Sequence, residues 1–428
     1  MTGKGSGHSR RGFLRGVAAA AAVPYFVPAT AFGKDGATAP SERITLGAIG
    51  IGPRGRYVLG AMMNEPGVRF LAVCDVQASR RRYVKNMADR KYGNTDCVMY
   101  RDMFELLGRD DIDTVLVATG DRWHALASIL AAKAGKDVYS EKPCGITMGD
   151  CQELADTMNR YGRVFQAGTQ RRSVGNFQFA VHLARSGKLG KIHTVHASIY
   201  KLRVDHSWLP AEPEPPKDVV DWDRWLGPAP WRPYNRRYCQ GRWRGYYDFD
   251  SGATLLDWGA HTVDLCQWAL DADHTTPLTY EPRGQEIYAR YANGVKLVMR
   301  AGGFRGEGNW LGLGTCPVRF EGDEGWVETG DSGRIALEPK SLMGERKRYL
   351  RGTDPAQHTS NFFDCVTSRA RTACNADVMR KSHLACHAAA IAWQLGRKVT
   401  FDPAKEAFVG DTEANRMRTR AKRAPWHA

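Results

Sequence analysis

The 428-residue sequence contains ten cysteines but no C-x-x-C pair. Cysteines scattered in this way match neither the closely spaced ligands of a zinc cluster nor the framework of a small disulfide-rich fold. We therefore expect most of the thiols to be small buried hydrophobic groups. The sequence also lacks internal repeats and low-complexity tracts, which excludes a repeat architecture. Its length favours two globular domains over one.

No apolar run beyond the first 31 residues is long enough to cross a bilayer. No DNA- or RNA-binding motif is visible, and the basic residues are dispersed except in the segment NRMRTRAKR near the C-terminus. Although the net charge is +15, we therefore expect a solubilising basic surface and no nucleic-acid partner. An acidic sugar substrate is the alternative explanation of the charge.

The first residues are typical of a targeting segment. A charged n-region, an apolar run and the small-x-small site Ala29-Thr30-Ala31 predict a signal peptide over residues 1–31, followed by a linker over 32–42. Arg10 and Arg11, followed by Phe13-Leu14, resemble the twin-arginine signal, which implies export in the folded state to the periplasm. An ordinary signal or an uncleaved anchor is the alternative.

From Ile44 the sequence alternates between apolar runs and amphipathic segments. The run ITLGAIG leads into GIGPRG, a G-x-G-x-x-G motif, and a second apolar run ends at Asp75, twenty residues past Gly55. A strand before the motif, a helix after it and an acid at that distance predict a dinucleotide site. The glycines allow the backbone to approach a pyrophosphate, and the Asp75 carboxylate would bind ribose hydroxyls. NAD is therefore expected over NADP, a preference that Arg80 to Arg82 would soften.

Six strand-like runs with intervening helices predict an α/β fold whose first domain, residues 43–168, is a doubly wound parallel sheet. We expect helices to begin near Trp123 and at about Met148. Ligands bind at the carboxyl ends of the strands in such sheets, where the turn Glu141-Lys142-Pro143 falls. Alternating runs bounded by glycines over residues 169–428 predict strands of a second domain.

Several segments together resemble the Gfo/Idh/MocA family of sugar and polyol oxidoreductases: GIGPRG, VATGDRWHALAS, SEKPCGITMGDCQEL, AGTQRR and GATLLDWGAHTVDLCQW. The resemblance covers nearly the whole chain after the leader. It implies that residues 169–428 form an α+β domain with an open and largely antiparallel sheet. It departs at Gly120, where many members have proline. The predicted cofactor contacts are Gly50, Gly52, Pro53, Arg54, Gly55, Asp75, Thr119, Trp123, His124, Glu141, Lys142 and Gln170.

Asp257, His261 and Asp264 are spaced to share one face of a helix. A carboxylate beside an imidazole raises its basicity and fixes its tautomer, as a general base requires. Taken singly, such residues are usually a capping Asp or a buried His, and no further ligands for a metal are present. The family resemblance implies that Asp257 and His261 act in catalysis with Lys142, while the sequence leaves open whether His261 or Lys142 is the base. Arg171 matches a substrate-contacting position.

The stretch from His206 to Trp243 is rich in both proline and tryptophan. It has too many prolines for a regular element and too many aromatic residues for a disordered linker. Two interpretations stay open: a wall on which sugar rings stack, or an arm that buries its aromatic residues on another subunit. The second implies a homo-oligomer.

The resemblance implies hydride transfer between a nicotinamide and a carbohydrate hydroxyl, with a tightly held cofactor because NADH is not readily recycled outside the cytoplasm. The alternative is an NAD-dependent glycosidase that oxidises a ring hydroxyl transiently and reduces it again. Some such relatives replace the lysine that stands here at Lys142, which favours oxidoreduction. A non-catalytic, cofactor-bound sensor is a third interpretation, which the presence of Lys142, Asp257 and His261 disfavours.

Overall fold

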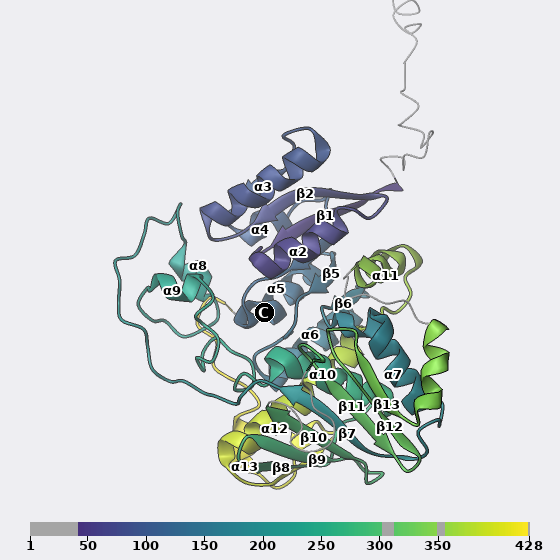
Figure 1. The fold of residues 1–428 in the computed structure, drawn as a ribbon. Helices are drawn as coiled ribbons and strands as arrows, with labels where there is room; N and C mark the ends of the chain where they lie inside the picture. Colours follow the sequence, from purple (N-terminus) through teal and green to yellow (C-terminus); the bar gives the residue numbers. More distant parts are fainter. Residues whose placement is uncertain (1–41, 302–311, 349–355, 427–428) are drawn as a thin grey trace, which may run out of the picture. The chain divides into compact units, whose positions relative to one another are not determined.

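The computed structural model describes residues 42–301, 312–348 and 356–426. Six parallel strands form its first sheet, in the order β3-β2-β1-β4-β5-β6 (Figure 1). The strands are β1 (Ile44–Ile49), β2 (Val68–Cys74), β3 (Val98–Tyr100), β4 (Thr114–Val117), β5 (Asp137–Ser140) and β6 (Phe165–Ala167). This order is that of a doubly wound sheet, so the predicted fold of the first domain is confirmed.

Helices cover both faces of this sheet, because alternate strand residues belong to two different hydrophobic clusters. Ile49 and Val117 pack in a cluster with residues of α5 and α6, whereas Leu46 and Leu116 pack in one with residues of α2 and α11. The helices are α2 (Pro53–Met62), α3 (Ala78–Tyr92), α4 (Met103–Leu107), α5 (Asp121–Lys133), α6 (Met148–Arg160) and α11 (Ala356–Ser368). Burial on both faces explains why the strands read as continuous apolar runs.

Two helices begin earlier than the sequence predicted. Helix α2 begins at Pro53, directly after the glycine turn, because proline is suited to the first helical position, where no N–H partner is needed. Helix α5 begins at Asp121, two residues before the predicted Trp123, whereas α6 begins at Met148 as expected. The predicted domain boundary at residue 168 falls between β6 and the 3-10 helix η3 (Gln170–Ser173) and stays a prediction.

The second sheet has nine strands in the order β13-β12-β11-β7-β10-β9-β8-β14-β15. All neighbouring strands are antiparallel except β7 and β10, which confirms the largely antiparallel prediction. The strands are β7 (Ile192–Ile199), β8 (Thr279–Arg283), β9 (Glu286–Arg290), β10 (Lys296–Ala301), β11 (Val318–Gly322), β12 (Gly325–Thr329), β13 (Ile335–Glu338), β14 (Val399–Asp402) and β15 (Ala407–Phe408).

The long helices α7 (Gly175–Arg185), α10 (Leu256–Ala269) and α12 (Ala376–Leu395) share one core with this sheet, to which the short helix α13 (Thr412–Arg416) adds Ala414 (Figure 1). Helix α12 also lies against α6 of the first domain and against α10. The apolar residues of α12 are buried almost all round the helix. Helix α12 therefore packs against α10, the helix that carries Asp257 and His261.

In the aromatic stretch from His206 to Trp243, two deeply buried tryptophans fit neither interpretation offered for it, and the predicted oligomer stays a prediction. Trp222 and Trp225 stack at 4.7 Å between ring centroids, inside a buried cluster that this stretch forms mainly with itself and with Phe249. Two short helices, α8 (Trp222–Leu226) and α9 (Arg236–Cys239), lie within it. Those two tryptophans are therefore available neither to a sugar nor to another subunit, because folding of the stretch onto itself already buries them.

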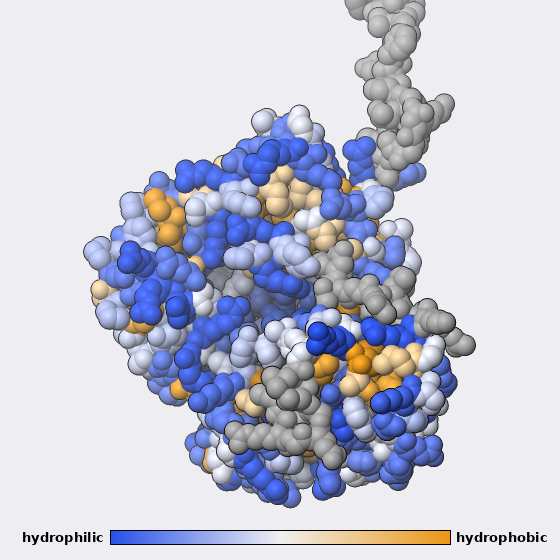
Figure 2. All heavy atoms as spheres, viewed as in Figure 1, coloured by the Kyte–Doolittle hydropathy of each residue, from blue (hydrophilic) through white to orange (hydrophobic). Residues whose placement is uncertain are grey.

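All ten cysteines are free and buried, as expected from their scattered positions. Within the described ranges, no helix combines the length and apolarity needed to cross a bilayer, and no group of three or more His, Cys, Asp or Glu is placed to hold a metal ion. On the face drawn in Figure 2, hydrophilic side chains cover most of the described surface.

Candidate active site

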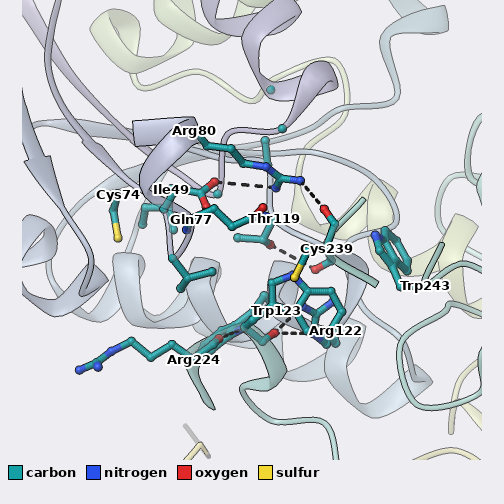
Figure 3. Close-up of a pocket in the computed structure, with 18 of the residues that line it drawn as sticks. Ile49, Cys74, Gln77, Arg80, Thr119, Arg122, Trp123, Arg224, Cys239 and Trp243 are labelled. Atoms are coloured by element: carbon teal, nitrogen blue, oxygen red, sulfur yellow. Dashed lines mark hydrogen bonds and ion pairs between the residues drawn. The ribbon is translucent and has the colours of Figure 1, made fainter. Parts of the chain in front are cut away.

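A cavity of about 710 Å³ lies at the carboxyl ends of β1, β2 and β4 (Figure 3). Its lining includes the predicted cofactor residues Gly50, Gly52, Pro53, Arg54, Gly55, Asp75, Thr119 and Trp123. We call it the nucleotide cavity. The predicted dinucleotide motif and Asp75, the acid that follows β2, thus line the same cavity.

The glycine turn leaves no room for side chains on its inner side. Gly50 has φ = +74°, and a Cβ added there would lie 2.2 Å from Thr119 Cγ2. A Cβ at Gly55 would lie 2.9 Å from the Cβ of Ala118. Helix α2 begins immediately after the turn without a side-chain cap, so the first N–H groups of the helix are left for a ligand. This arrangement fits the pyrophosphate of a dinucleotide.

Asp75 is buried at the end of β2, and one of its carboxylate oxygens, Oδ1, accepts a hydrogen bond from the Gln77 backbone at 2.8 Å. Its Oδ2 lies 3.9 Å from Arg80 Nη1. Burial raises the pKa of Asp75, and the positive charge of Arg80 offsets part of that effect. Both a hydroxyl-accepting carboxylate and a phosphate-binding cation therefore line this end of the nucleotide cavity.

One wall of the nucleotide cavity, which we call the far wall, is formed by residues of the aromatic stretch and by Trp426, for which the sequence predicted no cofactor contact. Arg80 Nη2 donates to the Cys239 carbonyl at 2.9 Å, and Trp123 Nε1 donates to the Arg224 carbonyl at 2.9 Å (Figure 3). The ring of Trp426, near the C-terminus, lies edge-on to Trp123 with centroids 5.1 Å apart and also lines the cavity. No local motif marks these residues, because long-range packing brings them to the site.

A second cavity of about 430 Å³ adjoins the first and shares Arg54, Ala118, Thr119 and Arg244 with it. We call it the substrate cavity. It is lined by the predicted residues His124, Glu141, Lys142, Arg171, Asp257 and His261. The residues predicted for catalysis, Lys142 after β5 and the pair Asp257 and His261 on α10, are thus brought to one place although more than 100 positions separate the lysine from the pair.

Lys142 leaves the turn after β5 and reaches α10. Its Nζ donates to the Asp257 backbone carbonyl at 2.6 Å and lies 3.8 Å from the Asp257 carboxylate. The carboxylate also pairs with Arg244 Nε at 3.3 Å. Asp257 therefore positions the lysine, with both its backbone and its side chain.

The charged groups around His261 differ from those that the sequence predicted. Arg171 Nη1 lies 2.7 Å from His261 Nε2, and the other ring nitrogen, Nδ1, has no hydrogen-bond partner among the described residues. Burial, together with the charges of Arg171 and Lys142, lowers the pKa of His261 well below its usual value. The expectation that a neighbouring carboxylate raises its basicity is therefore wrong, because cations face the ring instead.

Glu141 lines the substrate cavity, whereas Gln170, predicted as a cofactor contact, is not among the residues lining either cavity and contacts Glu141 instead. Glu141 Oε1 accepts from Gln170 Nε2 at 2.9 Å and from Arg54 Nε at 3.2 Å. Gln170 Nε2 also donates to the Tyr139 hydroxyl at 3.0 Å. Gly168 allows this arrangement, because a Cβ there would lie 2.9 Å from the Glu141 carboxyl carbon.

Three buried histidines fix the backbone that follows Lys142. His124 Nδ1 donates to the Pro143 carbonyl at 2.5 Å, and His383 Nε2 accepts from the Cys144 N–H at 3.2 Å. His387 Nε2 donates to the Gly145 carbonyl at 3.2 Å. His383 and His387 belong to α12, so the second domain helps to hold the lysine turn of the first. The sequence offered no signal for this role beyond three histidines in apolar surroundings.

These contacts predict acid sensitivity. Burial lowers the pKa of His358 to about 4 and those of His383 and His387 to about 3. Between about pH 6.5 and those values the unfolded chain binds protons that the folded chain does not. Each histidine should therefore remove about 1.4 kcal/mol of unfolding free energy per pH unit as the pH falls below about 6.5.

Urea titrations at several pH values between about 7.5 and 5 measure this loss. His383→Gln keeps an acceptor for the Cys144 N–H and should make the pH slope shallower by about one proton. The same change at the exposed His193 should leave the slope as it is. A free energy of unfolding that stays constant over this pH range would contradict the prediction.

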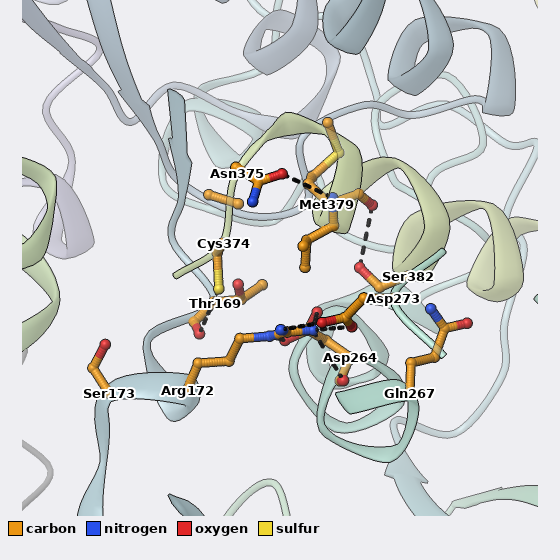
Figure 4. Close-up of polar contacts among 12 residues, drawn as sticks. Thr169, Arg172, Ser173, Asp264, Gln267, Asp273, Cys374, Asn375, Met379 and Ser382 are labelled. Atoms are coloured by element: carbon orange, nitrogen blue, oxygen red, sulfur yellow. Dashed lines mark hydrogen bonds and ion pairs between the residues drawn. The ribbon is translucent and has the colours of Figure 1, made fainter. Parts of the chain in front are cut away.

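A buried ion-pair network lies beside the substrate cavity (Figure 4). Arg172 donates from Nε and Nη2 to the Asp264 carboxylate at 2.7 and 2.8 Å, and from Nη1 and Nη2 to that of Asp273 at 2.8 and 2.6 Å. Burial raises the pKa of Asp264, and the charge of Arg172 opposes that effect. Asp264 therefore holds η3 against α10 through Arg172. The neighbouring Arg171 is held beside His261 by Asp331, to whose carboxylate its Nε and Nη2 donate at 3.0 and 2.6 Å.

Comparison with known proteins agrees with this geometry. Residues 44–169 match the model of the Gfo/Idh/MocA oxidoreductase family for its NAD-binding Rossmann fold, and residues 200–428 match the model for its C-terminal alpha/beta domain. The chain is 25% identical over 255 residues to an inositol 2-dehydrogenase of Salmonella typhimurium, covering 59% of this chain and 62% of that protein. It is 38% identical over 127 residues to a glycosyl hydrolase family 109 protein of Saccharopolyspora erythraea, covering 28% of this chain and 27% of that protein.

Solved structures show the same fold at low sequence identity. The WlbA dehydrogenase of Bordetella pertussis, in complex with NADH and UDP-GlcNAcA, aligns with a TM-score of 0.62 and 17% identity over 84% of this chain and 98% of that one. An aldose-aldose oxidoreductase of Caulobacter crescentus aligns with a TM-score of 0.59 and 17% identity, covering 84% and 100%. With its two family models matched in order along the sequence, the chain belongs to the Gfo/Idh/MocA oxidoreductase family.

Proposed function

We propose that this protein is an NAD(P)-dependent oxidoreductase that transfers a hydride between a nicotinamide cofactor and a CH–OH carbon of a sugar, polyol or glycoside. The observation that carries the proposal is the junction of the two cavities. The nucleotide cavity and the substrate cavity share Thr119 and Arg54, and Lys142 and His261 line the second cavity next to this junction. A cofactor in one cavity and a hydroxyl compound in the other would meet there.

The residues of the nucleotide cavity suit a dinucleotide. The Gly50 turn and the uncapped start of α2 would hold the pyrophosphate, and Asp75 the adenosine ribose. The bound cofactor supplies the site that accepts or donates the hydride. The chain itself aligns the reacting carbon and manages the hydroxyl proton.

In the direction of oxidation, the hydroxyl of the substrate loses its proton while its carbon loses a hydride. Lys142 Nζ, held by the Asp257 carbonyl, is placed to donate a hydrogen bond to the substrate oxygen. The two groups placed to take the hydroxyl proton are Lys142, in its neutral form, and His261, whose Nε2 lies 2.7 Å from Arg171 Nη1. Burial and the charges of Arg171 and Lys142 lower the pKa of His261, so the ring is neutral near neutral pH but is a weak proton acceptor.

Cofactor selectivity is expected to depend on Asp75 and Arg80. We expect NADH to bind about tenfold tighter than NADPH, because the buried Asp75 carboxylate repels a 2′-phosphate. Asp75→Ser should remove that difference, whereas Arg80→Ala should widen it by removing the cation 3.9 Å from Asp75. Fluorescence titration with both reduced nucleotides measures the ratio. Tighter binding of NADPH than of NADH to the wild-type protein would contradict this assignment.

We also propose that the cofactor stays bound between turnovers and that the protein is exported. Residues of the aromatic stretch and Trp426 form the far wall of the nucleotide cavity, which supports slow cofactor release. Copurification of NAD(H) tests retention. Arg10 and Arg11 support twin-arginine export to the periplasm, and their joint replacement by lysine should leave the protein in the cytoplasm.

We also propose that the protein forms a homo-oligomer. Trp208 and Trp231 of the aromatic stretch are 52% and 61% exposed, although the rest of that stretch has a buried core. Exposed tryptophans of this kind are enriched where proteins associate. Light scattering on the purified chain measures the assembly, and a monomer at all concentrations would contradict it.

Redox-neutral glycoside cleavage is the second candidate, favoured by the 38% identity to the glycosyl hydrolase family 109 protein. The two candidates are separated by mixing the NAD-loaded protein with a panel of sugars and aryl glycosides. A keto-sugar product or accumulating NADH indicates a dehydrogenase. Release of the aglycone without net NADH indicates the hydrolytic class. If no sugar changes the cofactor and no aglycone is released, both candidates are wrong.

A further inference from the structure

A group of arginines lies at the edge of the two cavities. Arg244 lines both cavities, and its side chain is 51% exposed. Arg203 Nη2 donates to the Arg244 backbone carbonyl at 2.8 Å, which places the two residues side by side. Arg237 and Arg242 are exposed, and the Arg242 N–H donates to the Arg237 carbonyl at 3.0 Å. We call Arg203, Arg237, Arg242 and Arg244 the basic rim.

Contacts with backbone and with an aromatic ring hold two of these arginines in place. Gly245 has φ = +85°, and a Cβ added there would lie 2.1 Å from Arg203 Nη2. Because glycine leaves this space open, the Arg203 guanidinium can lie against the backbone next to Arg244. Arg244 Cζ lies 4.5 Å from the centroid of the Trp243 ring, which lines the nucleotide cavity (Figure 3). The basic rim is therefore partly preorganised, as a binding surface requires.

Carboxylates of the protein neutralise little of the charge of the basic rim. Of its four arginines, only Arg244 forms an ion pair with a described residue, Asp257, at 3.3 Å. That carboxylate is shared with Lys142, whose Nζ lies 3.8 Å away. Three exposed guanidinium groups at the entrance to the site are therefore left to solvent or to a ligand.

One further carboxylate, that of Asp205, lies in this region. Burial raises the pKa of Tyr246, Asp205 acts in the same direction, and the charges of Arg237 and Arg203 oppose both. These charges therefore lie near one hydroxyl. Asp205 Oδ1 accepts hydrogen bonds from the Ser207 N–H and hydroxyl at 2.8 and 2.6 Å. One carboxylate thus faces two arginines, and the basic rim keeps an excess of positive charge.

We infer that the basic rim binds the carboxylate of a uronic acid residue, so that the substrate is an acidic oligosaccharide whose reacting sugar lies in the substrate cavity. A planar guanidinium binds a carboxylate through two parallel hydrogen bonds. A sugar attached to the reacting one would leave the cavity past Arg244, the residue that the cavity shares with the basic rim. The inference rests on the proposed function and narrows its substrate class to glycans with an acidic group outside the reacting sugar.

The test compares charged and uncharged forms of the same probes on the full-length protein with NADH bound. The probes are trigalacturonate and trimannuronate, each measured beside its methyl ester by isothermal titration calorimetry. We expect at least one acid to bind about tenfold tighter than its ester, and to lose that advantage as the NaCl concentration rises from about 50 to about 300 mM. Equal affinities of acid and ester, or no binding of either acid, would overturn the inference.

Variants assign the contact to the basic rim. Arg203→Gln and Arg242→Gln should each weaken binding of the acid about threefold, and together about tenfold, to the affinity of the ester. Neither residue lines a cavity, so binding of the ester and of NADH should not change. Arg90→Gln, at an exposed position of α3, removes the same charge and is the matched control. An unchanged affinity of the double variant, or an equal loss in Arg90→Gln, would refute the assignment.

Turnover separates this inference from the proposed function. Binding of an acid that depends on Arg203 and Arg242, without hydride transfer or glycoside cleavage, would refute the proposed function and support the binding role of the basic rim. Hydride transfer with the same KM for acid and ester, unchanged in the double variant, would do the opposite. The expected result is a KM for the acid about tenfold higher in the double variant, with a smaller change in kcat.

Discussion

Replacing Lys142 by methionine is expected to lower kcat about 1,000-fold and to leave NADH binding unchanged. Among the described residues that line the substrate cavity, Lys142 is the only lysine, and its Nζ is held 2.6 Å from the Asp257 carbonyl. Methionine has similar length but cannot donate a hydrogen bond to the substrate oxygen. Because the side chain does not line the nucleotide cavity, the cofactor should still bind.

Stopped-flow measurement of the nicotinamide absorbance gives the rate of hydride transfer, and NADH fluorescence gives the affinity. Lys191→Met, at an exposed position before β7, is the control and should behave as wild type. A thermal melt shows whether the Lys142 variant is folded. If that variant is folded, binds NADH and retains more than about a tenth of the wild-type rate, Lys142 does not have the assigned role.

Replacing Arg172 by leucine is expected to lower the free energy of unfolding by about 3–5 kcal/mol. Arg172 is buried and donates to two carboxylates, of which Asp264 is also buried (Figure 4). The variant leaves the Asp264 charge in an apolar interior without its cation, which is far more costly than the loss of an exposed pair.

The control for this prediction is Arg185→Leu. Arg185 also pairs with an aspartate, Asp271, at 2.7 Å, but the side chains are 41% and 76% exposed. Its loss should cost less than about 1 kcal/mol. Urea denaturation of both variants measures the difference. The double variant Arg172→Leu, Asp264→Leu should recover part of the loss, and equal costs for the two single variants would contradict the account.

The first sheet and its glycine turn were predictable because their signals are local. A parallel strand buried on both faces is a continuous apolar run, and the turn after β1 needs glycine at Gly50 whatever the rest of the chain does. The later strands of the second sheet were predictable for the same reason, since alternation and glycine turns are visible within a few residues.

The partners of the site residues were not predictable, because they come from distant segments. Spacing places Asp257 and His261 on one helix face. It does not show that Arg171 Nη1 lies 2.7 Å from His261 Nε2, or that Lys142 donates to the Asp257 carbonyl. Similarly, nothing local indicates that His383 holds the turn after Lys142. Composition did mark the stretch around Trp222 as unusual, yet only its folded form shows that the stretch buries Trp222 and Trp225 and forms a wall of the nucleotide cavity.

The central claim is that a nicotinamide in the nucleotide cavity exchanges a hydride with a carbohydrate in the substrate cavity. The most direct test is a single-turnover experiment on the protein loaded with NAD, in which a panel of cyclic sugars is added and the absorbance of the reduced nicotinamide is followed. We predict that at least one sugar reduces the bound cofactor in the wild-type protein but not in Lys142→Met. Failure of the protein to bind NAD would contradict the account. The account would also be contradicted if no sugar reduced the bound cofactor and the protein released no aglycone from aryl glycosides.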